Sequence, residues 1–201
     1  PRSLLIRQIV AILLTSLLSG CVLHPPMQIA DPAQLTHWLA EGKMGLRVAD
    51  RGGNLYFTWQ QEGTQYTLTL SGPLGAGRTE LVGTPEGVVL RNSDTGEVSA
   101  SSPELLLEAV TGYQAPVSYL AHWLKAQPAT RNAVIEKDEE GRARKITEDG
   151  WTAIFAAWDT GYPALPQKIL ITGPDTRLTV IISRWLPAAA PVTASTPALA
   201  P

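Results

Sequence analysis

The sequence predicts a mainly antiparallel β fold, curved into a barrel or partial barrel, with helices packed on it. Short runs with apolar residues at every second position recur along the chain, separated by clusters of Gly, Pro, Asn and Asp. Three other stretches carry apolar residues or capping residues at helical spacing. The alternating runs, which we predict as strands, are residues 44–48, 55–59, 66–70, 79–82, 88–91, 133–137, 143–147, 151–158, 168–172 and 177–185.

The first helix is predicted at the start of the folded region. Asp31, followed by proline, suits an N-cap and a first helical position. Leu35, Trp38 and Leu39 then lie at i, i+3 and i+4, which gives one apolar stripe. Gly42 is expected to end this helix.

Two more helices are predicted in the middle of the chain. Ser101 and Glu104 have the spacing of a capping box, which predicts a helix over residues 103–110. A further helix follows Pro116 and ends before Pro128.

Turns are predicted where Gly, Asn and Asp cluster between strands. The clusters are residues 51–54, 60–65, 94–96, 138–141, 149–150 and 173–175. Residues 71–77 contain three glycines and a proline, so this stretch is predicted as a surface loop.

The N-terminal segment has the features of a secretory signal. Arg2 and Arg7 precede the apolar run 9–14, which is too short for a spanning helix. Residues 18–21 resemble the lipobox of bacterial lipoproteins, in which the cysteine is acylated and becomes the first mature residue. An ordinary signal peptide with a chance cysteine, or a short anchor helix, are the alternatives. Cys21 is the only cysteine and lies at the cleavage position, which favours the lipobox.

Four segments follow from this interpretation. Residues 1–20 are expected to be the signal peptide, 21–31 a lipidated tether, 32–185 the folded domain and 186–201 a disordered tail. Ten of the last 16 residues are Ala or Pro, a composition that cannot bury enough surface to fold. Val22 follows the cysteine where an Asp would signal retention in the inner membrane of enterobacteria, so we expect the outer membrane, periplasmic face.

Composition excludes several classes of function. From Cys21 onward, 14 basic and 18 acidic residues give a net charge of −4, and no basic run is present, so nucleic acid is not an expected partner. With Cys21 acylated, no thiol remains for a disulfide, a redox site or a thiolate metal site. We expect no metal and no cofactor.

No constellation typical of an enzyme is present in the sequence. His37 and His122 each lie beside a tryptophan in a predicted short helix, where a surface or capping histidine is the simpler interpretation. The acidic run 138–140 lacks the alternating oxygen donors of a calcium loop, so we interpret it as a hairpin tip. We therefore assign no catalytic residue.

Tryptophan is frequent, and its role stays open at this point. Core filling is one interpretation, and the lining of an apolar cavity inside the sheet is the other. The six tryptophans are residues 38, 59, 123, 151, 158 and 185.

The order and spacing of several short motifs resemble the LolB family of outer-membrane lipoprotein receptors. The motifs that carry this resemblance are Trp38, Gly42-Lys43, Phe57-Thr58-Trp59, residues 66–70, residues 72–75, Leu105-Leu106, Thr111-Gly112, Pro116, residues 120–124, residues 149–151 and Trp185.

The resemblance implies an incomplete antiparallel barrel, helices that cover its opening, and an apolar cavity between them. It also implies a monomeric receptor that accepts lipoproteins from a LolA-like periplasmic carrier and inserts them into the inner leaflet of the outer membrane. The expected partners are that carrier, lipoprotein acyl chains and outer-membrane phospholipid.

Two other functions are the alternatives. A structural or assembly lipoprotein could dock a protein partner on the same curved sheet, and a solidly packed sheet would favour it. A lipid-anchored hydrolase is the third reading, and the missing catalytic motifs argue against it.

Alternation and the resemblance together predict the site residues. The predicted strand 55–59 presents Phe57 and Trp59 on one face, and the next strand presents Tyr66, Leu68 and Leu70. Antiparallel pairing would place the two sets on one apolar surface, which we predict to bind acyl chains.

Leu74 lies in the predicted loop 71–77, where a large aliphatic side chain is poorly placed to reach the core. The family's protruding loop carries an exposed apolar residue that maps onto Leu74, and the resemblance implies that it inserts cargo into the membrane. The alternative is that Leu74 folds back as a plug on the barrel end.

Overall fold

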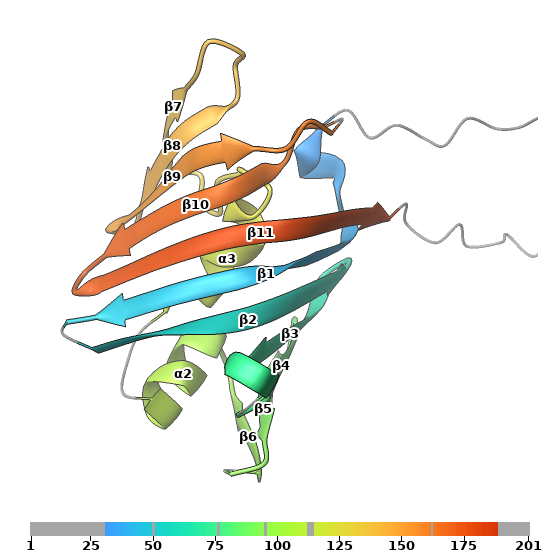
Figure 1. The fold of residues 1–201 in the computed structure, drawn as a ribbon, viewed down its shortest axis with the longest axis vertical. Coiled ribbons are helices and arrows are strands. Elements are labelled where there is room, and N and C mark those ends of the chain that lie inside the picture. The colour runs from blue at the N-terminus through green and yellow to red at the C-terminus, as the bar shows by residue number, and fades with distance from the viewer. Residues whose placement is uncertain are drawn as a thin grey trace, which may run out of the picture.

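The computed structural model describes residues 31–49, 51–75, 77–94, 96–111, 115–161 and 163–188. These residues form an 11-stranded antiparallel sheet in the order β6-β5-β4-β3-β2-β1-β11-β10-β9-β8-β7. The two ends of that order do not pair with each other, so the curved sheet is open, an incomplete barrel. The predicted fold class, mainly β with helices over one side, is confirmed (Figure 1).

The sheet consists of two meanders. The first contains β1 (His37–Val48), β2 (Arg51–Glu62), β3 (Gln65–Ser71), β4 (Thr79–Thr84), β5 (Gly87–Asn92) and β6 (Gly96–Ala100). The second contains β7 (Val134–Lys137), β8 (Ala143–Glu148), β9 (Trp151–Trp158), β10 (Pro166–Gly173) and β11 (Thr176–Ala188). The first and last strands, β1 and β11, pair along their whole length and join the meanders at the centre of the sheet.

The helices lie between the two meanders in sequence and on one side of the sheet in space. They are α2 (Pro103–Thr111) and α3 (Val117–Trp123), and in Figure 1 the sheet is in front of them. We call the side that faces them the inner face and the opposite side the outer face. Two short 3-10 helices, η2 (Pro32–Gln34) and η3 (Pro73–Gly75), complete the elements.

The core lies between the inner face and the helices. On β1 the even-numbered residues from Trp38 to Met44 are buried, whereas the odd-numbered ones are partly or fully exposed. The same period of two recurs on β9 and β10, as expected for a sheet with one face on the core. Each large apolar side chain buried in this way contributes about 1.5–3 kcal/mol to folding.

The first predicted helix is wrong. Asp31 does act as an N-cap, its carboxylate accepting a hydrogen bond from the Ala33 amide at 2.9 Å, but the helix ends after one turn of η2. From His37 onward the chain is β1, because pairing with both β2 and β11 outweighs the local helical pattern. Gly42, expected as a helix stop, lies at a register shift where the Ile181 carbonyl leaves no room for a Cβ.

The turn predicted at residues 51–54 is also wrong, because these residues are the start of β2. The chain leaves β1 after Val48 instead, with Ala49 at a φ of 48°. Gly52 allows a close approach of the two strands, because a Cβ at this position would lie 2.8 Å from the Leu46 carbonyl oxygen.

Three smaller differences concern element ends. The α2 helix is capped by Ser102, whose Oγ accepts from the Leu105 amide at 3.3 Å, and not by Ser101. Strand β6 was not predicted at all, although the ten predicted strands are all present. The last strand continues to Ala188, so the first three residues of the segment predicted as a tail belong to the sheet.

The predicted signal peptide, the lipid attachment residue Cys21 and residues 189–201 of the predicted tail lie outside the described residues.

Candidate functional site: the inner face of the sheet

The five residues predicted to bind acyl chains meet on the inner face. Phe57 pairs with Leu70 and Trp59 with Leu68, while Tyr66 lies opposite Gln61. Phe57, Trp59 and Leu68 are buried in the core cluster, and Tyr66 and Leu70 pack against it half-buried. The two strands therefore present one continuous apolar surface to the helices, and its role in binding stays a prediction.

Aromatic rings extend this surface across the centre of the sheet. The Tyr66 and Trp59 ring centroids are 4.9 Å apart and nearly parallel, and Trp59 stacks on Trp38 at 6.0 Å. Trp38 in turn contacts Trp185 of β11 at 5.4 Å. Trp38 and Trp185 were missed as site residues, Trp38 because its segment was expected to be helical. The tryptophan count was the signal that could have found both.

Two polar atoms in this apolar layer have no hydrogen-bond partner. They are Trp38 Nε1 and Tyr66 Oη, both buried. Burial, with a smaller effect from the Glu104 carboxylate, raises the pKa of Tyr66 to about 12, so its hydroxyl keeps its proton. Unpartnered buried donors are costly, at about 1–3 kcal/mol each, and uncommon. Both are N–H or O–H groups, so the layer offers two free donors to a carbonyl oxygen.

The α3 helix is fastened to the sheet by a buried carboxylate. Trp123 Nε1 donates to Glu148 Oε1 at 2.6 Å, and the amides of Ala129 and Thr130 donate to the same group. Burial by itself would raise the pKa of Glu148, but these donors outweigh it and hold the pKa below its usual range. Glu148 is therefore ionised at neutral pH, and α3 is fixed over the second meander.

The α2 helix is held more weakly than α3. Among its described side chains only Leu106 is buried, and Leu105 is 55% exposed. By contrast α3 buries Val117, Leu120 and Trp123. A polar link joins the two helices, because the Glu104 carboxylate accepts hydrogen bonds from the amide and hydroxyl of Ser118, at 2.7 and 3.0 Å.

Apolar side chains of the sheet and of the helices meet between these two layers. Trp59, Leu81 and Trp123 are fully buried, and residues from both meanders and both helices belong to one cluster. Of the two helices, α2 has fewer buried side chains among the residues whose burial is described.

Leu74 is the middle residue of η3, the short helix between β3 and β4. The loop turns tightly, with the Gly75 amide donating to the Gly72 carbonyl at 3.1 Å. Pro73 lines a pocket of about 420 Å³ together with Tyr56 and Ile181, whose side chains are on the outer face. The η3 loop therefore lies against the outer side of the sheet rather than over the core.

The described residues contain no group of three His, Asp or Glu side chains arranged to hold a metal ion. His37 is in β1 and not in a helix as expected, with its Nδ1 3.0 Å from the Thr36 hydroxyl. His122 is in α3 as expected, where burial and Lys125 lower its pKa. In the acidic hairpin 138–140, Asp138 and Glu140 both pair with Arg142, so these carboxylates are engaged in ion pairs. No helix in the described ranges has the length and apolar composition needed to cross a bilayer.

Comparison with known proteins points in one direction. A family model described as outer membrane lipoprotein LolB matches residues 36–185. The chain is 34% identical over 200 residues to the outer-membrane lipoprotein LolB of Stutzerimonas stutzeri, covering 91% of this chain and 97% of that protein. It is 38% identical over 154 residues to the LolB of Alkalilimnicola ehrlichii, covering 75% and 76% of the two chains.

Among solved structures, a LolA superfamily protein from Nitrosomonas europaea superposes with a TM-score of 0.49 at 6% identity, over 79% of this chain and 89% of that one. A superposition this loose carries no conclusion about the inner face.

Proposed function

The chain belongs to the outer-membrane lipoprotein LolB family, and from that premise we propose that it is a receptor for lipoproteins. In this role it accepts lipoproteins from a LolA-like periplasmic carrier and inserts them into the inner leaflet of the outer membrane. The family is one of lipoprotein binding and transport, so the chain is not an enzyme.

One observation carries the proposal. The five predicted residues share an apolar inner face, and α2 on that side of the sheet has one buried side chain, Leu106, among those described. Three acyl chains hold on the order of 40 methylenes, and exposing each to water costs about 0.8 kcal/mol, so free diffusion would cost roughly 30 kcal/mol. Transfer from one apolar interior to another avoids this cost. The acyl chains enter as α2 moves away, and the direction of transfer follows from a difference in affinity between carrier and receptor.

The unpartnered donors support the same use of the inner face. An acylated N-terminus carries ester and amide carbonyls beside its hydrocarbon chains, and Trp38 Nε1 and Tyr66 Oη are free to donate to such oxygens. This pairing would remove the penalty that the empty protein carries at both atoms.

Anchoring by Cys21 is a separate part of the proposal. Three chains on one cysteine would hold the protein at the outer membrane from the periplasmic side. Replacing Cys21 with Ala abolishes acylation and releases the protein from membranes, which fractionation measures. A variant that still sediments with outer membranes would rule out lipid as the sole anchor.

Leu74 is proposed to act in delivery rather than in acceptance. A single leucine that enters a bilayer contributes about 1.5–3 kcal/mol, too little to anchor the protein but enough to orient it. In Leu74→Glu, cargo should still be accepted from the carrier, while its insertion into liposomes fails.

The experiment mixes the chain, made water-soluble by Cys21→Ala, with a carrier–lipoprotein complex and follows the cargo by affinity capture, then adds liposomes. Thr64→Glu puts the same charge into the exposed β2–β3 turn, at the other end of β3, and should leave both steps intact. Cargo that stays on the carrier contradicts the receptor role and favours docking of a protein partner. Normal delivery by Leu74→Glu contradicts only the loop assignment, and failed acceptance would place Leu74 in the cavity or the fold.

A further inference from the structure

The outer face of strands β1, β11, β10 and β9 carries more cations than carboxylates. Glu41 is the one acidic residue within β1, β11, β10 and β9, and its carboxylate is bonded by Arg184 at 2.9 Å. Among the described residues no carboxylate forms an ion pair with Lys43, Arg47, Lys168 or Arg177, four cations of these strands. Lys43 lies over the Tyr56 ring, 5.3 Å from its centroid.

On the two wings of the sheet, by contrast, several cations are paired with carboxylates. On β4–β6, Arg91 pairs with Glu80 and Glu97. On the β7–β8 hairpin, Arg144 and Lys145 both pair with Glu136. The part of the chain that follows Cys21 is acidic, with 14 basic and 18 acidic residues, so composition does not account for unpaired cations at its centre.

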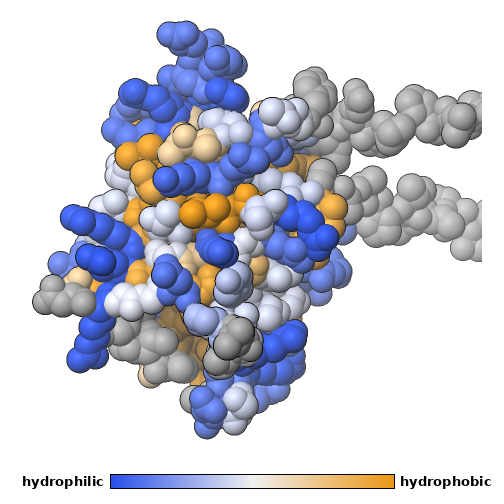
Figure 2. Space-filling model, viewed as in Figure 1, coloured by the Kyte–Doolittle hydropathy of each residue, from blue (hydrophilic) through white to orange (hydrophobic). Residues whose placement is uncertain are grey.

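Exposed aliphatic side chains stand between these cations. Ile181 lies directly opposite Lys43 on one side and Lys168 on the other, and it is 47% exposed. Leu170 and Ile154, 36% and 40% exposed, pair with each other one row further along. Figure 2 shows this face, with hydrophobic side chains set among hydrophilic ones over the central strands.

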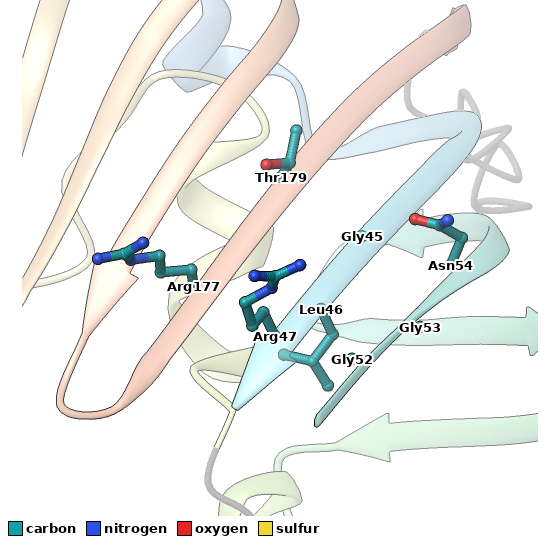
Figure 3. A pocket seen from close by; sticks show the side chains of 8 residues that line it. All are labelled: Gly45, Leu46, Arg47, Gly52, Gly53, Asn54, Arg177 and Thr179. Carbon is teal, nitrogen blue, oxygen red and sulfur yellow. The ribbon is translucent and has the colours of Figure 1, made fainter. Parts of the chain in front are cut away.

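A polar pocket of about 630 Å³ opens at one end of this surface (Figure 3). Arg47 and Arg177 are direct cross-strand partners at its rim, and like charges in such positions repel each other. Asn54 and Thr179 also line it. The lining thus supplies two guanidinium groups, an amide and a hydroxyl, donors suited to a phosphate group.

We propose that this outer face docks on a membrane surface that carries anionic phospholipid. Headgroup phosphates meet the lysines and the Arg47–Arg177 pocket, and Ile154, Leu170 and Ile181 reach the boundary of the acyl region. Interleaved cations and aliphatic residues fit such a surface, because each Lys or Arg near an anionic leaflet contributes about 1 kcal/mol. The η3 loop lies on the same side, since Pro73 lines a pocket with Lys43 and Ile181.

Docking by the outer face would turn α2 and α3 away from the bilayer. The helices cover the opposite face of the sheet, so the weakly held α2 would then face the water through which a carrier arrives. The proposal rests on the placement of the protein at the outer membrane and not on its acceptance of lipoproteins.

The test uses the acylated full chain in vesicles of phosphatidylcholine, with or without phosphatidylglycerol. Cys21 is the only cysteine and is consumed by lipid, so Ile181→Cys and Leu105→Cys can each be labelled with a fluorophore. Quenchers on the lipid chains should quench the label at 181 in the anionic vesicles and leave the label at 105 on α2 unaffected. Flotation and mass spectrometry verify the anchor independently, so a failed anchor is distinguished from failed docking.

Charge reversal supplies the second arm. Lys43→Glu with Lys168→Glu should lower the ratio of docked to undocked protein by at least about 25-fold, from about fivefold for each cation lost. Arg131→Glu with Lys137→Glu makes the same change in charge at exposed positions away from this face and should leave the ratio unchanged.

Three results would overturn the proposal. They are no quenching at 181, equal quenching in both kinds of vesicle with no effect of charge reversal, and shielding of position 181 that appears only when the carrier protein is added. The last result would assign the outer face to a protein partner.

Discussion

On the inner face of the sheet, Phe57, Trp59 and Leu68 of β2 and β3 are apolar and buried, whereas their neighbours Thr58, Gln60 and Thr67 point outward and are polar. The outer face tolerates unpaired charge, as Lys43 and Arg47 show. The inner face accommodates a charge at Glu148 only because several donors surround it. The difference shows that the free-energy cost of a charged residue depends on the face toward which its side chain points, and not on its position along the strand.

The largest loss of stability is expected where a charge is placed on the inner face. Leu68 is 2% exposed on the inner face, so Leu68→Glu places an unpaired carboxylate in the core. We expect a loss of about 4 kcal/mol or more in the free energy of unfolding, and impaired cargo acceptance by any folded protein. Urea denaturation followed by circular dichroism measures the first, and the transfer assay the second.

The adjacent residue provides the control. Thr67 points to the outer side of the same strand, opposite Gln60 and Val82, so Thr67→Glu should change stability by less than about 0.5 kcal/mol. Equal losses in both variants would show that the two faces do not differ in this way. Normal cargo acceptance by a folded Leu68→Glu protein would remove Leu68 from the binding surface.

The alternation that defines these faces is also why the sequence predicts so much of the fold. Strand β3 carries an unbroken period of two, with Tyr66, Leu68 and Leu70 alternating with threonines, and it is found where it was expected. The prediction for the segment after Asp31 is wrong because Leu35, Trp38 and Leu39 fit a helical stripe as well as Trp38 and Ala40 fit a strand. Pairing of β1 with β2 and with β11, some 140 residues away, decides between the two, and local pattern contains no information about the distant partner.

The candidate site is predictable in part for the same reason. Phe57, Trp59 and Leu68 follow from alternation, whereas the contact of Trp38 with Trp185 depends on β1–β11 pairing. The outer-face pocket is still harder to predict from the sequence, because Arg47 and Arg177 become neighbours only through that same pairing.

A smaller but substantial loss of stability is expected from a change at Glu148. This change tests whether the inner face accommodates a charge only because hydrogen-bond donors surround it. Glu148→Gln retains the shape but loses the charge-assisted hydrogen bonds to Trp123, Ala129 and Thr130. Since such bonds contribute about 1.5–3 kcal/mol, we expect a loss of about 2–3 kcal/mol at pH 7. Glu139→Gln, at an exposed hairpin position, should cost less than about 0.5 kcal/mol.

The pH dependence of that loss follows from the lowered pKa of Glu148. A carboxylate whose pKa is depressed by folding adds stability above its unfolded pKa and loses it as the pH falls through the folded value. The stability difference between wild type and Glu148→Gln should therefore be largest near neutral pH and shrink below about pH 4. Denaturant unfolding at several pH values measures it, and a constant difference would mean that the charge of Glu148 is not what the donors stabilise.

The smallest change in the free energy of unfolding is expected at Tyr66. The sign of this change shows whether the hydroxyl serves stability or cargo binding. The Tyr66 hydroxyl is buried with no partner, so Tyr66→Phe should leave the empty protein equally stable or raise its free energy of unfolding by up to about 1 kcal/mol. Tyr119 provides the opposite case, because its hydroxyl donates to Asp149 at 2.7 Å and Tyr119→Phe should lose about 0.5 kcal/mol. If Tyr66 Oη donates to a carbonyl of the bound lipoprotein, Tyr66→Phe should weaken cargo binding about fivefold while Tyr119→Phe leaves it unchanged. A Tyr66→Phe protein that is less stable, yet binds cargo as tightly as wild type, would show that the hydroxyl belongs to the fold and not to the site.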